Sequence, residues 1–116
     1  MIRTKIAIPK YFPALLTLVF MLSIGLGQAM AQDTRLAQQY YNNGEYEKAA
    51  STYKGLYDKN PNSNHYFDRY VDCLIKLESF TEAEEAVKKE IKKSPKKVQL
   101  YVSYGNIYER QFKEAE

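Results

Sequence analysis

The sequence predicts an all-α protein in which antiparallel helix–turn–helix units stack as an α-solenoid. The first observation is a set of landmarks that recur 34 residues apart: an aromatic residue (Tyr46, Phe80), an alanine (Ala49, Ala83) and a proline (Pro61, Pro95). The second is that apolar residues after position 31 follow helical spacing, with no alternating strand pattern between them. A fixed period of this length is typical of stacked helical repeats.

The first 31 residues form a separate segment. Its start is positive (Arg3, Lys5, Lys10), residues 11–31 carry no charge, and the dense apolar centre covers residues 15–26. The run Ala29-Met30-Ala31 supplies the small residues of a cleavage site. This order is the layout of a secretory signal peptide. We therefore expect cleavage after Ala31 and export of residues 32–116 to the periplasm or cell envelope of a bacterium.

An uncleaved membrane anchor is the alternative for the same segment. The uncharged run is long enough to cross a bilayer core of ~30 Å at ~1.5 Å per residue. However, its polar and helix-breaking residues shorten the strongly apolar part to the length found in signal peptides (Pro13, Thr17, Ser23, Gln28). Under either interpretation, residues 32–116 cross the membrane or stay at its surface.

Charge and residue types narrow the functional classes. The chain has 17 basic and 14 acidic residues, and the leader holds three of the basic ones, so the remainder is electrically neutral. The pI of about 8.9 therefore does not indicate nucleic-acid binding. His65 is the single histidine, without metal-ligand neighbours, and Cys73 sits beside a core face without a positive neighbourhood. We expect no catalysis, no metal and no cofactor.

The first repeat unit consists of two expected helices. The first covers residues 32–43, with Asp33 or Thr34 as its cap and Leu36, Ala37, Tyr40 and Tyr41 on one face. The turn Asn42-Asn43-Gly44 ends it, because Asn and Gly tolerate the left-handed conformation. The second covers residues 45–59 and ends before Pro61, which cannot continue a helix.

The same pattern then restarts. We expect a helix from Ser63 or Asn64 to about residue 77, a turn at Glu78-Ser79, and a helix over residues 80–93 that is closed by Ser94-Pro95. A fifth helix is expected over residues 97–110, with Leu100, Tyr101, Tyr104, Ile107 and Tyr108 inward, and Phe112 begins a sixth. Short connections of this kind imply antiparallel neighbours.

These residues resemble the tetratricopeptide repeat family. The first-helix pattern of that family appears as Tyr101, Tyr104-Gly105 and Tyr108, and as Phe67, Tyr70-Val71 and Leu74, followed on the second helix by Ala83, Val87 and Pro95. The units are about 30–63, 64–97 and an incomplete 98–116. The resemblance implies a superhelix with a concave face and a scaffold for protein–protein contacts. Because two and a half units are marginal in stability, we expect the N-terminal part of a longer protein, with a sensor or assembly role as an alternative function.

The concave face implied by the resemblance supplies the candidate site. Its residues are Tyr41, Arg69, Lys76, Asn106 and Arg110, and the expected partner is a protein or peptide. Thr34 and Gln38 stand where carboxylate-clamp members of the family have Lys and Asn, so that clamp is not expected. Arg69 and Arg110 either pair with a partner's carboxylate or form salt bridges among neighbouring first helices.

The segment Lys88–Lys97 holds the one concentrated charge, six lysines that follow three glutamates on the same helix. Glu84 and Lys88, and Glu85 and Lys89, have the spacing of favourable pairs, and the lysines match the negative end of the helix dipole. A solvated helix is one interpretation, and contact with acidic lipid headgroups is the other. Self-association is also expected to be possible, since an incomplete C-terminal unit offers a face to another copy's first unit.

Overall fold

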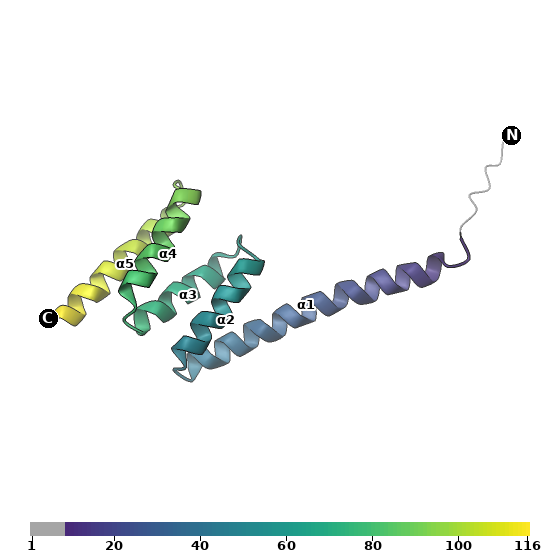
Figure 1. The fold of residues 1–116 in the computed structure, drawn as a ribbon, viewed down its shortest axis with the longest axis horizontal. Coiled ribbons are helices and arrows are strands. Elements are labelled where there is room, and N and C mark those ends of the chain that lie inside the picture. Colours follow the sequence, from purple (N-terminus) through teal and green to yellow (C-terminus); the bar gives the residue numbers. More distant parts are fainter. Residues whose placement is uncertain (1–8) are drawn as a thin grey trace. The chain divides into compact units, whose positions relative to one another are not determined.

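Helices account for all regular secondary structure in the described part of the chain. The computed structural model describes residues 9–116, apart from the side chains of residues 23–27 (Figure 1). The helices are α1 (Phe12–Asn42), α2 (Tyr46–Lys59), α3 (Asn64–Lys76), α4 (Phe80–Lys93) and α5 (Val98–Ala115). This confirms the predicted all-α class. By its internal contacts the chain divides into residues 1–32 and residues 33–116.

The N-terminal unit is helical from Phe12 onward, and its apolar side chains are exposed. Arg3 and Lys5, the first two basic residues of the expected leader, lie outside the described residues. The exposed apolar side chains are Tyr11, Phe12, Leu15, Leu16, Leu18, Val19, Phe20, Met21 and Leu22. The expected helix start at Asp33 or Thr34 is wrong, because α1 continues through both residues. Within residues 9–116, no helix has the length and apolarity that crossing a bilayer requires.

Two equivalent turns join the two helices within a repeat unit: one lies between α1 and α2, and the other between α3 and α4. After α1, Gly44 has φ 76°, and its N–H and that of Glu45 bond to the carbonyls of Tyr41 and Tyr40. After α3, Glu78 has φ 57°, and its N–H and that of Ser79 bond to the carbonyls of Ile75 and Leu74. Both are Schellman motifs with a left-handed residue after the helix. The two expected turns are therefore confirmed, one repeat apart.

The prolines and a serine cap fix the other boundaries. α2 ends at Lys59, just before Asn60-Pro61, and α4 ends at Lys93, just before Ser94-Pro95. Ser63 caps α3, since its hydroxyl accepts a hydrogen bond from the N–H of Tyr66 at 3.4 Å. These boundaries agree with the sequence prediction.

The predicted sixth helix is wrong. α5 runs without a break from Val98 to Ala115, so Phe112 lies inside it. One repeat length after Gly44 and Glu78, position 112 holds a bulky aromatic residue. Phenylalanine is poorly suited to the left-handed conformation that the two earlier turns use, whereas it continues a helix readily.

The core lies between the helices of residues 33–116. Its members are Ala37, Ala49, Ala50, Tyr53, Leu56, Phe67, Tyr70, Val71, Cys73, Leu74, Ala83, Val87, Leu100 and Ile107. Ala49 and Ala83, the small residues of the repeat, are fully buried. Small side chains at these places let neighbouring helices approach, and the larger ones fill the space beside them.

Three residues differ from the predicted core faces. Leu36 and Tyr101 were expected inward but are 39% and 49% exposed, and Ser103 is buried although it was not predicted to be. Ser103 is accommodated because its hydroxyl donates to the carbonyl of Gln99 at 3.1 Å. Helical spacing gives an apolar face, but the direction from which neighbours cover that face depends on the packing of the other helices.

Candidate binding groove between α3 and α5

A polar cluster joins the end of α1 to α3. The Tyr41 hydroxyl donates a hydrogen bond to the Asp72 carboxylate. The Arg69 guanidinium lies 4.7 Å from the centre of the Tyr41 ring, and the Lys76 ammonium lies 5.8 Å from it. Burial and the bond to Asp72 raise the pKa of Tyr41 to about 12, which keeps the phenol protonated. Tyr41, one of the predicted binding residues, is half-buried, and its hydroxyl is engaged by Asp72.

An open groove lies beside this cluster, between α3 and α5. Its lining consists of Asp72, Ile75, Lys76, Asn106, Glu109 and Arg110, around a volume of about 300 Å³. A second hollow of about 160 Å³ shares three of these residues and adds Asp68, Val71, Gln99 and Ser103. The two hollows adjoin, since Asp72, Ile75 and Asn106 line both, and we call them together the α3–α5 groove.

The cations of the α3–α5 groove are available to a ligand. Neither Lys76 nor Arg110 has a carboxylate within 4 Å among the described residues, and both side chains are exposed. The nearby Glu109 pairs instead with Lys113 at 2.6 Å, and that bond lowers the pKa of its carboxyl. Among the described residues, neither Arg69 nor Arg110 therefore makes the salt bridge that was considered for it. Arg69 stacks on an aromatic ring and Arg110 faces the groove.

The second hollow of the groove contains a further carboxyl group, that of Asp68. Asp68 is half-buried, and burial raises the pKa of its carboxyl, an effect that the positive Lys97 partly offsets. The groove thus carries both signs of charge: Lys76, Arg110, Asp72 and Glu109 line one hollow, and Asp68 and Asp72 line the other.

The five predicted site residues fall into two groups that share one member. Tyr41, Arg69 and Lys76 form the cluster at α1 and α3, while Lys76, Asn106 and Arg110 line the groove. Sequence reasoning missed Ile75 and Glu109 as lining residues. Their spacing was a usable signal, because Ile75 is three residues after Asp72, and Glu109 three after Asn106, on their helices.

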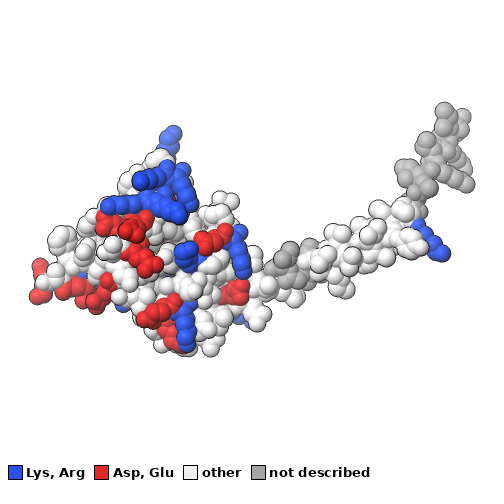
Figure 2. Space-filling view, in the orientation of Figure 1, with Lys and Arg blue, Asp and Glu red and all other residues white. Residues whose placement is uncertain are grey.

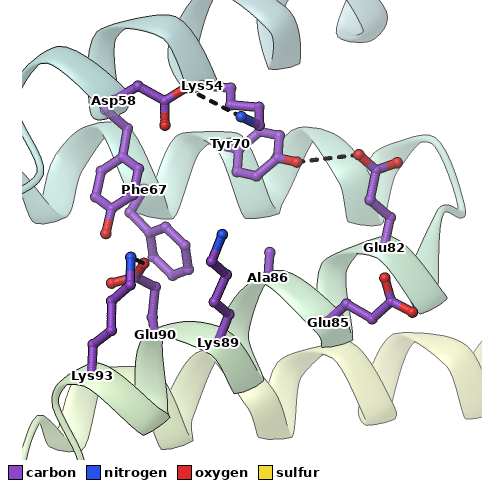
Figure 3. Close-up of a pocket in the computed structure, with 11 residues that line it drawn as sticks. Lys54, Asp58, Phe67, Tyr70, Glu82, Glu85, Ala86, Lys89, Glu90 and Lys93 are labelled. Atoms are coloured by element: carbon purple, nitrogen blue, oxygen red, sulfur yellow. Dashed lines mark hydrogen bonds and ion pairs between the residues drawn. The ribbon is translucent and has the colours of Figure 1, made fainter.

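A separate hollow, outside the α3–α5 groove and not predicted from the sequence, opens among α2, α3 and α4 (Figure 3). It measures about 250 Å³, and Phe67, Tyr70 and Ala86 contribute to its wall. Its charges are largely paired within the wall: Lys54 with Asp58 at 3.2 Å, Lys93 with Glu90 at 3.2 Å, and Glu82 with the Tyr70 hydroxyl at 3.2 Å. This pairing leaves the hollow less receptive to a charged ligand than the α3–α5 groove.

The lysines of Lys88–Lys97 gather at the end of α4, where Figure 2 shows a cluster of basic side chains. The expected pair of Glu84 and Lys88 is present. The expected pair of Glu85 and Lys89 is wrong: the two side chains form no ion pair, and both line the hollow of Figure 3. Lys92 and Lys96 make no ion pair with the described residues and are exposed.

The comparison with family models decides the relationship. Residues 28–116 match the PRP39 N-terminal HAT repeat. The chain belongs to the HAT repeat family. No curated protein and no solved structure gives a match. HAT stands for half-a-TPR, so the resemblance to tetratricopeptide repeats is confirmed at the level of a TPR-like helical repeat.

Membership of the HAT family sets the broad functional class. HAT repeats are helical repeats that typically mediate protein interactions or scaffolding, and they are generally non-catalytic. In the described part of the HAT chain, Cys73 is fully buried, and burial raises the pKa of its thiol to about 11. Such a thiol is a packed residue and a poor nucleophile. The described residues contain no group of three or more His, Cys, Asp or Glu placed to hold a metal ion.

Proposed function

We propose that this chain is an exported HAT-repeat scaffold, without catalysis of its own, that binds a protein segment in the α3–α5 groove. The observation that carries the proposal is a pair of exposed cations in one groove, Lys76 and Arg110, which have no carboxylate within 4 Å among the described residues and lie beside Asn106. A guanidinium and an ammonium offer carboxylate-binding donors, and an amide side chain pairs with a peptide backbone. The favoured segment therefore carries an acidic side chain and an exposed backbone.

The cluster behind the groove supports this function by holding its wall in place. Tyr41 contacts Asp72 through its hydroxyl and lies under Arg69 and Lys76 through its ring. These contacts limit the conformations of Lys76 before a ligand arrives. Side chains ordered in advance lose less entropy on binding, which favours affinity.

Site-specific cross-linking in cells tests the groove. A photo-reactive phenylalanine analogue at Asn106 is expected to capture a protein partner, whereas the same residue at Glu47, exposed on α2, serves as the matched control. Arg110→Glu is expected to abolish capture at position 106, because the reversed charge repels an acidic segment. Capture that is equal at both positions, or unchanged by Arg110→Glu, contradicts the proposal.

Export is the second part of the proposal, and the leader composition supports it. The uncharged residues 11–31 end in Ala29-Met30-Ala31, which meets the requirement for small residues at a cleavage site. The mature chain then begins at Gln32. Mass spectrometry of the protein from the envelope fraction tests this: an N-terminus at Gln32 supports export with cleavage, and one at Met1 supports the anchored alternative.

The lysines at the end of α4 support a further contact with acidic lipid headgroups at the membrane surface. Lys92 and Lys96 are exposed and unpaired with the described carboxylates. Lysines near an anionic membrane each contribute about 1 kcal/mol of attraction. Co-sedimentation with vesicles that contain phosphatidylglycerol is expected to fall for Lys92→Glu/Lys96→Glu, while binding to neutral vesicles is expected to stay the same. Equal binding of both forms to anionic vesicles contradicts this contact.

A further inference from the structure

The hollow of Figure 3 has an aromatic floor that the core holds in place. Phe67 and Tyr70 of α3 line it, and they are only 4% and 7% exposed. The ring of Tyr57, on α2, lies 5.1 Å from the Phe67 ring between centres, at an angle of 48°. Ala86 of α4 contributes a methyl group to the wall. The hollow therefore has an apolar surface beside a residue too small to fill it.

Most polar groups of the wall are paired with one another. Glu82 accepts a hydrogen bond from the Tyr70 hydroxyl at 3.2 Å. The ion pairs of the wall, each at 3.2 Å, are Lys54 with Asp58 and Lys93 with Glu90. An uncharged group that enters the hollow leaves these pairs intact, whereas an ion competes with partners that are already in place. The wall therefore favours an uncharged occupant.

Two charged side chains of the wall are exceptions to this pairing. Glu85 and Lys89 are exposed, about one turn apart on α4, and neither forms an ion pair with the described residues. Figure 3 shows Ala86 between them. A carboxylate accepts hydrogen bonds, and an ammonium is attracted to the face of an aromatic ring. One repeat earlier the same positions hold Ser51 and Gly55, so this acceptor and this cation belong to the second unit and not to the repeat in general.

The size of the hollow favours a single side chain over a free small molecule. Pockets for small-molecule ligands measure ~300–1,000 Å³ and enclose most of the ligand. This hollow has about 250 Å³ and opens to solvent. Protein interfaces often depend on a few anchoring side chains, among which Trp, Tyr and Arg are enriched. Arg carries a charge that the paired wall disfavours, whereas Trp and Tyr combine a ring for the floor with a hydrogen-bond donor for Glu85.

We propose that the hollow among α2, α3 and α4 is a docking site for a tryptophan or tyrosine side chain of a partner protein. The ring packs on Phe67 and Ala86, its donor bonds to the Glu85 carboxylate, and the Lys89 ammonium covers the ring face. This site shares no lining residue with the α3–α5 groove. The two sites are therefore tested separately, and failure of one leaves the other standing.

NMR of the full chain with ¹³C-labelled alanine methyl groups tests the site, because Ala86 lies in its wall. The probe is N-acetyl-tryptophanamide, and the chain itself contains no tryptophan, so the indole signals belong to the probe alone. We expect a saturable ring-current shift of the Ala86 methyl, with a dissociation constant on the order of millimolar. N-acetyl-leucinamide, which has no ring, is expected to bind at least threefold more weakly. Ala14, exposed in the leader, reports non-specific binding to apolar surface.

A substitution at Glu85 tests the part played by the donor. Glu85→Ala is expected to weaken binding of N-acetyl-tryptophanamide at least threefold, and to leave unchanged that of N-acetyl-phenylalaninamide, whose ring has no donor. Glu47→Ala, at an exposed glutamate of α2 outside the hollow, is the matched control and is expected to change neither. The proposal is overturned by the absence of a saturable shift at Ala86, by equal shifts at Ala14 and Ala86, or by equal effects of the two substitutions. Free tryptophan that binds tenfold more tightly than the capped probe also overturns it, because that result identifies a small-molecule site.

Discussion

The phenol of Tyr41 donates a hydrogen bond to the carboxylate of Asp72, a residue 31 positions later in the chain. This bond joins α1 to α3, the first helices of two successive repeat units. The Tyr41 ring also carries Arg69 on its face. One side chain therefore links the two units and shapes the wall of the α3–α5 groove.

Tyr41→Phe is expected to destabilise the chain by about 1.5 kcal/mol, the lower end for hydrogen bonds to charged groups, because the bond is only half-buried. Urea unfolding followed by circular dichroism measures the change. Tyr101→Phe is the matched control. Its hydroxyl bonds to the carbonyl of Pro95 in an exposed setting, so its loss is expected to stay within about 0.5 kcal/mol. Equal losses for both variants argue against a structural role for the Tyr41–Asp72 bond.

Alkaline pH is expected to weaken the fold. Burial raises the pKa of Tyr41 and of Tyr70 from 10.0 to about 12, and it also raises the pKa of Tyr53 and Tyr57. In the unfolded chain these phenols lose their protons near their ordinary pKa, so above pH 10 the folded state holds more protons. Stability is therefore fully present below pH 10 and is lost as pH rises toward 12.

Urea midpoints measured at a series of alkaline pH values check this prediction, together with the tyrosinate absorbance. We expect a fraction of the tyrosines to titrate only on unfolding. Tyr70→Phe removes one of the shifted groups and is expected to make the decline with pH less steep. A single titration of all tyrosines near their ordinary pKa, in a chain that stays folded, is the contrary result.

Glu78→Gly is expected to stabilise the chain by about 1 kcal/mol. Glu78 has φ 57°, a conformation that costs a residue with a Cβ roughly 1–2 kcal/mol and glycine far less. The equivalent position of the first unit already holds glycine, Gly44 with φ 76°. The reverse change there, Gly44→Ala, is expected to destabilise by about 1 kcal/mol or more. Chemical unfolding of both variants measures the change in the free energy of unfolding. The two changes have opposite signs if the turns are equivalent, and the same sign if they are not.

The sequence was sufficient for the elements that local chemistry determines. The turns at Gly44 and Glu78, the Ser63 cap and the helix ends before Pro61 and Pro95 were all predictable, because each depends on a few neighbouring residues. The break expected before Phe112 was wrong, since the turn there was inferred from a period and the local residues favour a helix.

The candidate site was predictable in part, for a different reason. The positions of Lys76, Asn106 and Arg110 follow from helical spacing, and the structure places all three on one groove. Their pairing does not follow from spacing. Glu109 pairs within its own helix and Arg69 stacks on Tyr41, which depends on how closely α1 and α3 approach. Side-chain contacts between helices are set by packing that no local pattern encodes.

The rate at which the Cys73 thiol reacts is expected to report the unfolding of the second repeat unit, which contains α3 and α4. It is fully buried among core residues, and burial raises its pKa to about 11, so few thiolates exist at pH 8 and reagents do not reach them. A thiol reagent such as Ellman's reagent is expected to label it only when the chain opens, at a rate that tracks the opening equilibrium. Val87→Ala, a fully buried core change, is expected to destabilise by about 2 kcal/mol and to raise the labelling rate roughly 30-fold. Fast labelling of the unmodified chain, or labelling that Val87→Ala leaves unchanged, indicates that the core around α3 is not closed.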